Sequence, residues 1–207
     1  MSQYGFHFDG QRCSGCKTCV LACKDYNDLT PEISLRNVYE YVGGSWEQGE
    51  GGLWGNDVYS YFVSVACNHC DEPACLTVCP QKAISKDPET GLVTRDIDLC
   101  IGCGACATAC PYGAPKVDPA QSKSVKCDDC AGRVAAGELP VCVQACPVRA
   151  LDFGPIDELR EKYGDVAAVA PLPKADLTKP NLVITEPRHA KEAGDETGAV
   201  ANPREIA

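Results

Sequence analysis

The sequence predicts an α+β fold built from two similar modules of short β-hairpins and short helices, with an inserted β-hairpin and an extended C-terminal arm. Three observations lead to this prediction. Sixteen cysteines occur in four groups of four, strand-like runs flank the groups, and two longer stretches of different composition interrupt or follow them. The groups are Cys13, Cys16, Cys19 and Cys23; Cys67, Cys70, Cys75 and Cys79; Cys100, Cys103, Cys106 and Cys110; and Cys127, Cys130, Cys142 and Cys146.

The central segment 67–110 resembles half of a bacterial ferredoxin followed by its repeat. Residues 83–85 and 92–94 have the pattern of two short strands, and residues 87–91 between them have turn chemistry. In bacterial ferredoxins three cysteines of a group hold one 4Fe-4S cluster and the fourth binds the other cluster. The two expected ligand sets are therefore Cys67, Cys70, Cys75 and Cys110, and Cys100, Cys103, Cys106 and Cys79.

A second module is expected to form from both ends of the core. One strand-like run, 4–8, precedes the first group and another, 150–153, follows the last, so the two halves of one hairpin stand far apart in the sequence. We pair the first group with the last, because pairing neighbouring groups would split the local repeat. The expected ligand sets are Cys13, Cys16, Cys19 and Cys146, and Cys127, Cys130, Cys142 and Cys23. The predicted domains are 1–24 with 111–160, the insertion 25–66, the central module 67–110 and the arm 161–207.

The spacing of the cysteines predicts four 4Fe-4S clusters. Four soft thiolates on short loops can converge on one cluster, and small residues such as Gly15 and Gly102 permit the close approach. Zinc is the alternative, but zinc sites use isolated pairs of cysteines, and cysteines this close together do not readily form disulfides. His69, inside the second group, is expected only to line its site. No nucleophile–base pair or nucleotide loop is apparent, so we expect no catalytic residue and no enzyme activity of the protein on its own.

The insertion and the arm each admit two interpretations. The runs 38–42 and 58–63 alternate as in a β-hairpin, around a glycine-rich tip with Trp46 and Trp54. Its aromatic residues either cover a cluster or form a docking surface for a partner. A helical turn at 156–163 precedes the arm, whose prolines favour an extended conformation. Residues 166–184 are expected to lie along a partner, and disorder is expected from Glu186 onward.

Charge limits the choice of partners. The formal net charge is -10, and four clusters would bring the loaded protein to about -18, which repels nucleic acid and anionic lipid alike. Four lysines could offset cluster charge: Lys17, Lys24, Lys116 and Lys126. No stretch is long and apolar enough to span a bilayer, and residues 1–9 carry no signal peptide. We expect no direct membrane insertion, and membrane association only through a partner.

Two segments, 110–115 (CPYGAP) and 146–155 (CPVRALDFGP), carry a more specific resemblance. With the order of the four groups, the hairpin residues 39–41 and the proline-rich arm, they resemble the electron-transfer iron-sulfur subunits of membrane-bound molybdopterin oxidoreductases, most closely the anaerobic dimethyl sulfoxide reductase branch. The resemblance covers nearly the whole sequence. The family's nested ligand pattern maps onto all sixteen cysteines and agrees with the pairing above.

That resemblance implies an electron relay between two partners, a quinol-oxidising membrane anchor and a molybdopterin catalytic subunit that reduces sulfoxides or N-oxides. It places the protein peripherally on the cytoplasmic membrane, on a side that the sequence leaves open. The alternatives are the iron-sulfur subunit of another molybdoenzyme, acting on polysulfide, thiosulfate, tetrathionate or formate, and a freestanding polyferredoxin.

Overall fold

A small sheet joins the two ends of the protein. The computed structural model describes residues 3–206, and in it β1 (Tyr4–Asp9) pairs antiparallel with β10 (Leu151–Pro155), with Phe6 opposite Phe153. The third strand, β11 (Leu182–Thr185), runs parallel to β1 on its other side. The predicted pairing of the strand before the first cysteine group with the strand after the last is therefore confirmed, as is the α+β class.

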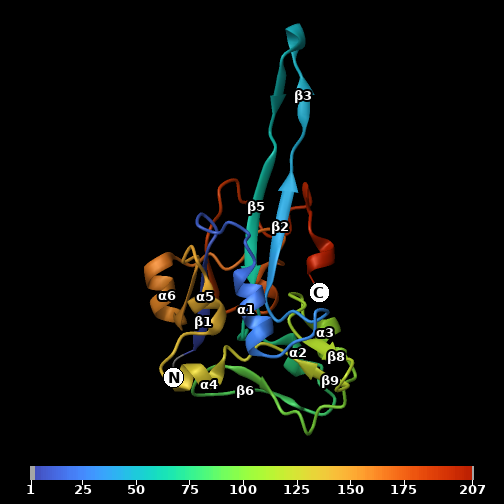
Figure 1. Cartoon of the computed structure of the whole chain (residues 1–207), viewed down its shortest axis with the longest axis vertical. Coiled ribbons are helices and arrows are strands. Elements are labelled where there is room, and N and C mark those ends of the chain that lie inside the picture. Colours follow the sequence, from blue (N-terminus) through green and yellow to red (C-terminus); the bar gives the residue numbers. More distant parts are fainter. Residues whose placement is uncertain (1–2, 207) are drawn as a thin grey trace.

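The insertion forms a long β-hairpin that projects from the body (Figure 1). Its inner part is β2 (Asn37–Gly43) paired antiparallel with β5 (Tyr59–Val65). Its outer part is β3 (Trp46–Gln48) paired with β4 (Trp54–Asn56), closed by the one-turn helix η1 (Glu50–Gly52). The predicted hairpin is thus confirmed.

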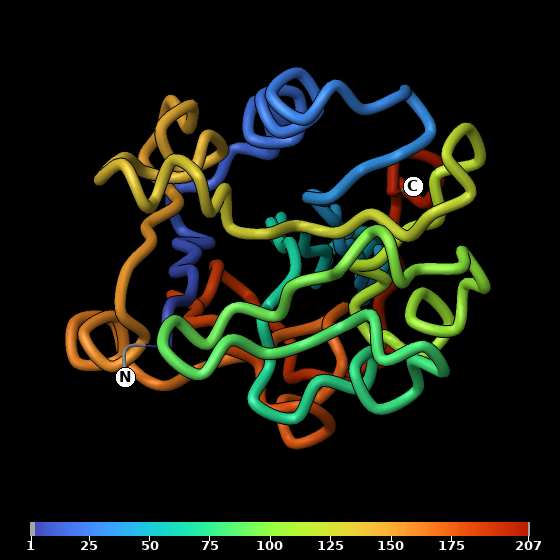
Figure 2. The backbone as a smooth tube through the Cα atoms, turned by 90° about the horizontal axis from the view of Figure 1, so that it is seen from below, coloured from blue at the N-terminus to red at the C-terminus, as the bar shows by residue number. Residues whose placement is uncertain are grey.

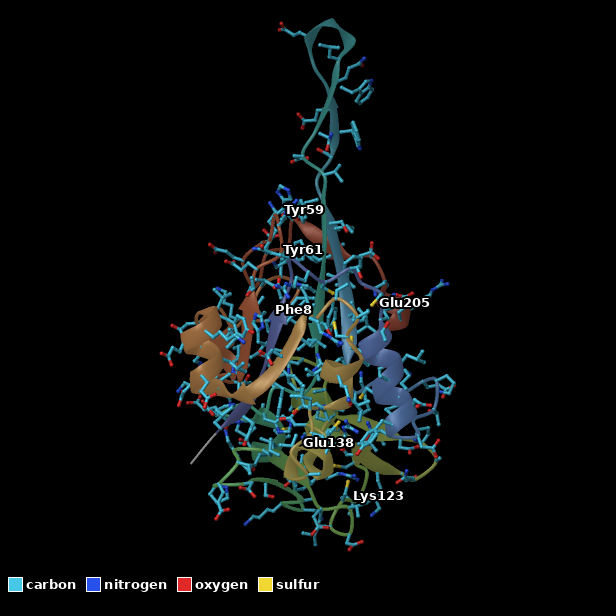
Figure 3. All side chains as sticks on the ribbon, turned by 60° about the vertical axis from the view of Figure 1, so that its left-hand side comes forward. Phe8, Tyr59, Tyr61, Lys123, Glu138 and Glu205 are labelled. Atoms are coloured by element: carbon cyan, nitrogen blue, oxygen red, sulfur yellow. The ribbon has the colours of Figure 1, made fainter. Side chains whose placement is uncertain are left out.

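The inner and outer parts of this hairpin differ in burial. Tyr41, Tyr59 and Tyr61 of the inner part lie in the main core, and in Figure 3 Tyr59 and Tyr61 follow the base of the hairpin towards Phe8. At the tip, Trp46 and Trp54 are 63% and 62% exposed. The aromatic residues therefore divide between the two interpretations: the inner ones cover the core, and the outer ones face solvent.

Short elements carry the rest of the body. The central segment has α2 (Ala74–Thr77), the hairpin of β6 (Ile84–Lys86) and β7 (Val93–Arg95), and α3 (Ala105–Ala109). Each of these strands begins one residue later than the sequence predicts. A further hairpin of β8 (Lys116–Asp118) and β9 (Lys123–Val125) follows, then α4 (Ala131–Ala135) and α5 (Val141–Ala145). The helix α1 (Thr18–Tyr26) packs against α5, and α6 (Ile156–Tyr163) packs against β1 and β11.

The C-terminal segment is ordered against the rest of the protein. After η2 (Ala175–Leu177) and β11 it adds a strand, β12 (Gly198–Val200), antiparallel to β2, and ends in η3 (Pro203–Glu205). The expectation of disorder from Glu186 onward is wrong, because β2 offers a free edge that this segment completes. The two termini lie on opposite sides of the body (Figure 2). Among residues 3–206, no helix has the length and apolar character needed to cross a membrane.

Candidate metal centres

Short helices bring several of the cysteines into the interior. The helix that follows the first loop, α1, carries two of them one turn apart, and each later group places one on a one-turn helix. These residues are Cys19 and Cys23 on α1, Cys75 on α2, Cys106 on α3 and Cys142 on α5. All five are buried, so the helices direct their thiols away from solvent.

The loops before these helices require glycine. Gly15 and Gly102 have φ values of 69° and 68°, in the left-handed region that favours glycine. A Cβ on Gly15 would lie 2.5 Å from the ring of Phe62, and one on Gly102 would lie 2.0 Å from the carbonyl oxygen of Ser122. Neither loop could therefore approach its neighbour so closely with another residue at these positions.

Three cavities are each lined by four cysteines. In every case three come from one group and the fourth is the last cysteine of another group. We call them sets 1, 2 and 3: Cys13, Cys16, Cys19 and Cys146; Cys67, Cys70, Cys75 and Cys110; and Cys79, Cys100, Cys103 and Cys106. All sixteen cysteines are free of disulfides.

The four remaining cysteines are all buried. They form set 4: Cys23, Cys127, Cys130 and Cys142. Burial raises the pKa of Cys23 to about 12, and the charges of Cys142 and Cys130 act in the same direction. Cys127 is likewise held by burial at a pKa of about 12, with Cys23 among the charges that raise it. The structure thus brings together three of the quartets expected from the sequence, and charge interactions link members of the fourth.

The chemistry of these quartets fits an iron-sulfur cluster. Burial is the main cause that raises the pKa of Cys13 to about 11 and that of Cys75 to about 12, so these thiols are neutral unless a positive centre binds them. Iron binds thiolate, and a positively charged core restores the stabilisation that burial removes. Four soft donors on tight loops match the 4Fe-4S cluster.

A buried polar network separates set 2 from set 4. The amine of Lys126 donates hydrogen bonds to the carbonyl oxygens of Val93 and Cys127, the latter at 2.6 Å. His69 is 1% exposed; its Nδ1 accepts the Val93 N–H at 2.8 Å, and its Nε2 lies 3.1 Å from Oδ1 of Asp129. Because Nδ1 is an acceptor, the ring proton is on Nε2, facing the carboxylate.

This network acts on the cysteines on both sides. Burial opposes ionisation of Cys67, but the charge of Lys126 and hydrogen bonding by His69 lower its pKa to about 6. His69 also counteracts the effect of burial on Cys127. His69 therefore does more than line the site of the second group, because it acts to lower the pKa of Cys67 in set 2 and of Cys127 in set 4.

The four lysines named from the sequence differ in their surroundings. Lys126 alone is buried among cysteines. Lys17 pairs with Glu205, and Lys24 donates to the carbonyl oxygens of Pro31 and Ile33, each at 2.7 Å.

Lys116 lies near Cys110, and burial is the main cause that lowers its pKa. The sequence reasoning missed Arg36, which lies buried beside cysteines of sets 1 and 4. The signal that marks it is a single arginine in the otherwise uncharged run 33–38 (ISLRNV).

Comparison with known proteins identifies the family. A family model described as "4Fe-4S dicluster domain" matches residues 58–156, and one described as "4Fe-4S binding domain" matches residues 11–27. The sequence is 56% identical to a subunit of the anaerobic dimethyl sulfoxide reductase of Escherichia coli strain K12 over 205 residues, 99% of each protein. It is 52% identical to the subunit of the same name from Haemophilus influenzae over 206 residues, all of both proteins.

A more distant relative is "Protein NrfC" of Escherichia coli strain K12, 35% identical over 184 residues, which cover 87% of this sequence and 79% of that protein. The two reductase subunits match along nearly their entire length, and the family models describe 4Fe-4S binding. The protein therefore belongs to the family of iron-sulfur electron-transfer subunits of anaerobic dimethyl sulfoxide reductases.

Proposed function

We propose that this protein holds four 4Fe-4S clusters, one in each of sets 1 to 4, and relays electrons between two partner subunits of a respiratory reductase. The observation that carries the proposal is the nested composition of the quartets, in which each of three cavities takes its fourth cysteine from a different group. Each cluster, when bound, would take up and release one electron. The protein fixes the positions of the sulfurs, excludes water and supplies local charge.

The quartets are proposed to form a row in the order set 1, set 4, set 2, set 3. Sets 1 and 4 share α1, because Cys19 and Cys23 lie one turn apart on that helix. Sets 4 and 2 share Lys126 and His69, which act on Cys67 and Cys127. Sets 2 and 3 are joined by the short segment from Cys75 to Cys79, which packs in one core cluster.

The ends of this row reach the surface. Cys16 in set 1 and Cys103 in set 3 are exposed, whereas every cysteine of sets 4 and 2 is buried or half-buried. An electron relay needs an accessible site at each end and shielded sites between. We therefore propose that one partner docks near Cys16 and the other near Cys103.

The partners are proposed from the relatives' names and from the hairpin. The most similar relatives described above are named as subunits of a dimethyl sulfoxide reductase, so we propose a molybdopterin catalytic subunit that reduces sulfoxides or N-oxides and a membrane anchor that oxidises quinol. The tip of the projecting hairpin supports a bound partner, because Trp46 and Trp54 are exposed at the end of a ribbon that is only two strands wide. The protein would then lie on the membrane through the anchor.

Two measurements test this proposal. Purification from native membranes through a tag on this protein is expected to recover a catalytic and an anchor subunit, and about 16 iron and about 16 acid-labile sulfide per molecule. Stoichiometric zinc without sulfide would exclude the clusters. Recovery of the tagged protein alone, loaded with iron and in the soluble fraction, would favour the freestanding polyferredoxin instead.

A further inference from the structure

Arg36 is a charged residue in the middle of the protein. It directly precedes β2 and is 1% exposed, and it is the largest of the side chains that are completely enclosed. A guanidinium keeps its charge at any ordinary pH, so the fold encloses a permanent cation. The groups that surround it must offset the cost of removing that charge from water.

The neutral neighbours of Arg36 do not offset this cost. Nη1 donates a hydrogen bond to Oγ of Ser64 at 3.2 Å, and the guanidinium lies 4.5 Å from the centre of the Phe6 ring. Nε and Nη2 have no hydrogen-bond partner, and no ion pair among the described residues joins Arg36 to a carboxylate. A buried ion left in this state costs a large share of the free energy that stabilises a domain.

The negative charges within reach of Arg36 are sulfurs. Burial alone would lower the pKa of Arg36, but the charges of Cys142, Cys19, Cys127 and Cys23 raise it. Three of these cysteines belong to set 4 and one, Cys19, belongs to set 1. Ser64 extends the link to set 1, since its Oγ lies 3.5 Å from the sulfur of Cys19.

We propose that Arg36 is a positioning residue that sets the reduction potentials of the clusters in sets 1 and 4. This inference rests on the proposed function, because it requires clusters in both sets. A reduced cluster carries one more negative charge than an oxidised one. A fixed cation in a dry interior therefore stabilises the reduced form and raises the potential.

The unpaired donors add to this effect. Hydrogen bonds to cluster sulfurs also raise the potential, and Nε and Nη2 are the free N–H groups of a side chain that Ser64 and Phe6 hold in place. One arginine thus influences two neighbouring positions of the proposed relay together.

The test is a redox titration of the intact, membrane-bound complex, followed by electron paramagnetic resonance. Arg36→Gln removes the cation, and Arg36→Lys keeps the charge but replaces the planar guanidinium and its several N–H donors with an ammonium group. Arg12→Gln is the matched control, because Arg12 directly precedes Cys13 but its side chain is 63% exposed and screened by solvent. Variants in which one cysteine of set 1 or of set 4 is replaced by serine assign each electron paramagnetic resonance signal to its cluster.

With Arg36→Gln, the ratio of reduced to oxidised cluster in sets 1 and 4, at fixed ambient potential, is expected to fall at least tenfold, or about 59 mV for one electron. Arg36→Lys is expected to shift it two- to tenfold, and Arg12→Gln less than twofold. If the glutamine variant does not retain its clusters, Arg36→Met, which fills the same space without a charge, decides, and a shift below twofold in a charge-free variant that retains its clusters overturns the inference.

Iron and sulfide content separates the two possible failures. A wild-type protein without clusters would overturn the proposed function. Full iron and sulfide in every variant with unchanged potentials would overturn the role of Arg36 alone.

Discussion

Asn202 fastens the C-terminal strand to the projecting hairpin. Its Oδ1 accepts the backbone N–H of Glu40 at 2.8 Å, and its Nδ2 donates to the carbonyl oxygen of Val38 at 2.9 Å. A further bond to the exposed carboxylate of Glu205 contributes little. Asn202→Ala removes the two bonds to the β2 backbone, each of which is worth about 1 kcal/mol, so we expect the strand to be held less tightly by about 2 kcal/mol.

Hydrogen exchange measures this change directly. The N–H of Ala201 donates to the carbonyl oxygen of Glu40 at 2.8 Å and exchanges only when the C-terminal strand opens. A loss of about 2 kcal/mol corresponds to exchange about 30-fold faster at Ala201. Glu196→Ala, which alters an exposed side chain on the same segment, is the control and is expected to leave this rate unchanged.

Two results would refute this reasoning. If the Ala201 amide of the unmodified protein already exchanges as fast as that of an unfolded peptide, the strand β12 does not form. If Asn202→Ala and Glu196→Ala give equal rates, the strand forms but the side chain of Asn202 does not hold it.

Three further predictions concern ligands, partners and packing. Cys146→Ser should damage the cluster in set 1 and spare set 4, as seen by electron paramagnetic resonance; damage confined to set 4 would contradict the nested pairing. Trp46→Ala combined with Trp54→Ala should reduce recovery of a partner subunit at least tenfold at unchanged iron content. Unchanged recovery would exclude the hairpin tip as a binding site for that partner. Phe8→Ala, at a fully buried site, should lower the stability of the loaded protein by about 3–5 kcal/mol, measured by denaturant titration without oxygen; a loss below about 1 kcal/mol would show that the core around it collapses.

Local patterns in the sequence predicted the elements around the cysteines because those elements are determined locally. Turn chemistry and alternation predicted the positions of β6 and β7 to within one residue. The strands predicted at 4–8 and 150–153 are paired in the structure. The quartets followed from spacing together with one ferredoxin rule. The hairpin of β8 and β9, whose strands are as short as β6 and β7, was missed because residues 119–122 between its strands contain no glycine to mark the turn.

Features that depend on distant contacts were not predictable in the same way. The prolines after residue 166 suggested a segment that lies along a partner up to residue 184 and is disordered from Glu186 onward, but its order comes from edges provided by β1 and β2 of this protein. The burial of Arg36 likewise depends on Phe6, Ser64 and two quartets, none of which is its neighbour in sequence. A single charge in an uncharged run marks such a position without revealing what surrounds it.

The C-terminal segment links the two predicted modules to each other. Thr178 lines the cavity of set 2, and the carbonyl oxygen of Lys179 accepts the N–H of Asp71 in the loop of the second cysteine group. A few residues later β11 pairs with β1, which leads into the cysteines of set 1. One short segment, 178–185, therefore contacts the surroundings of sets 1 and 2. These sets belong to different predicted modules, so this protein itself would hold them at a fixed spacing, and in the proposed relay the partner subunits need only bind at its two ends.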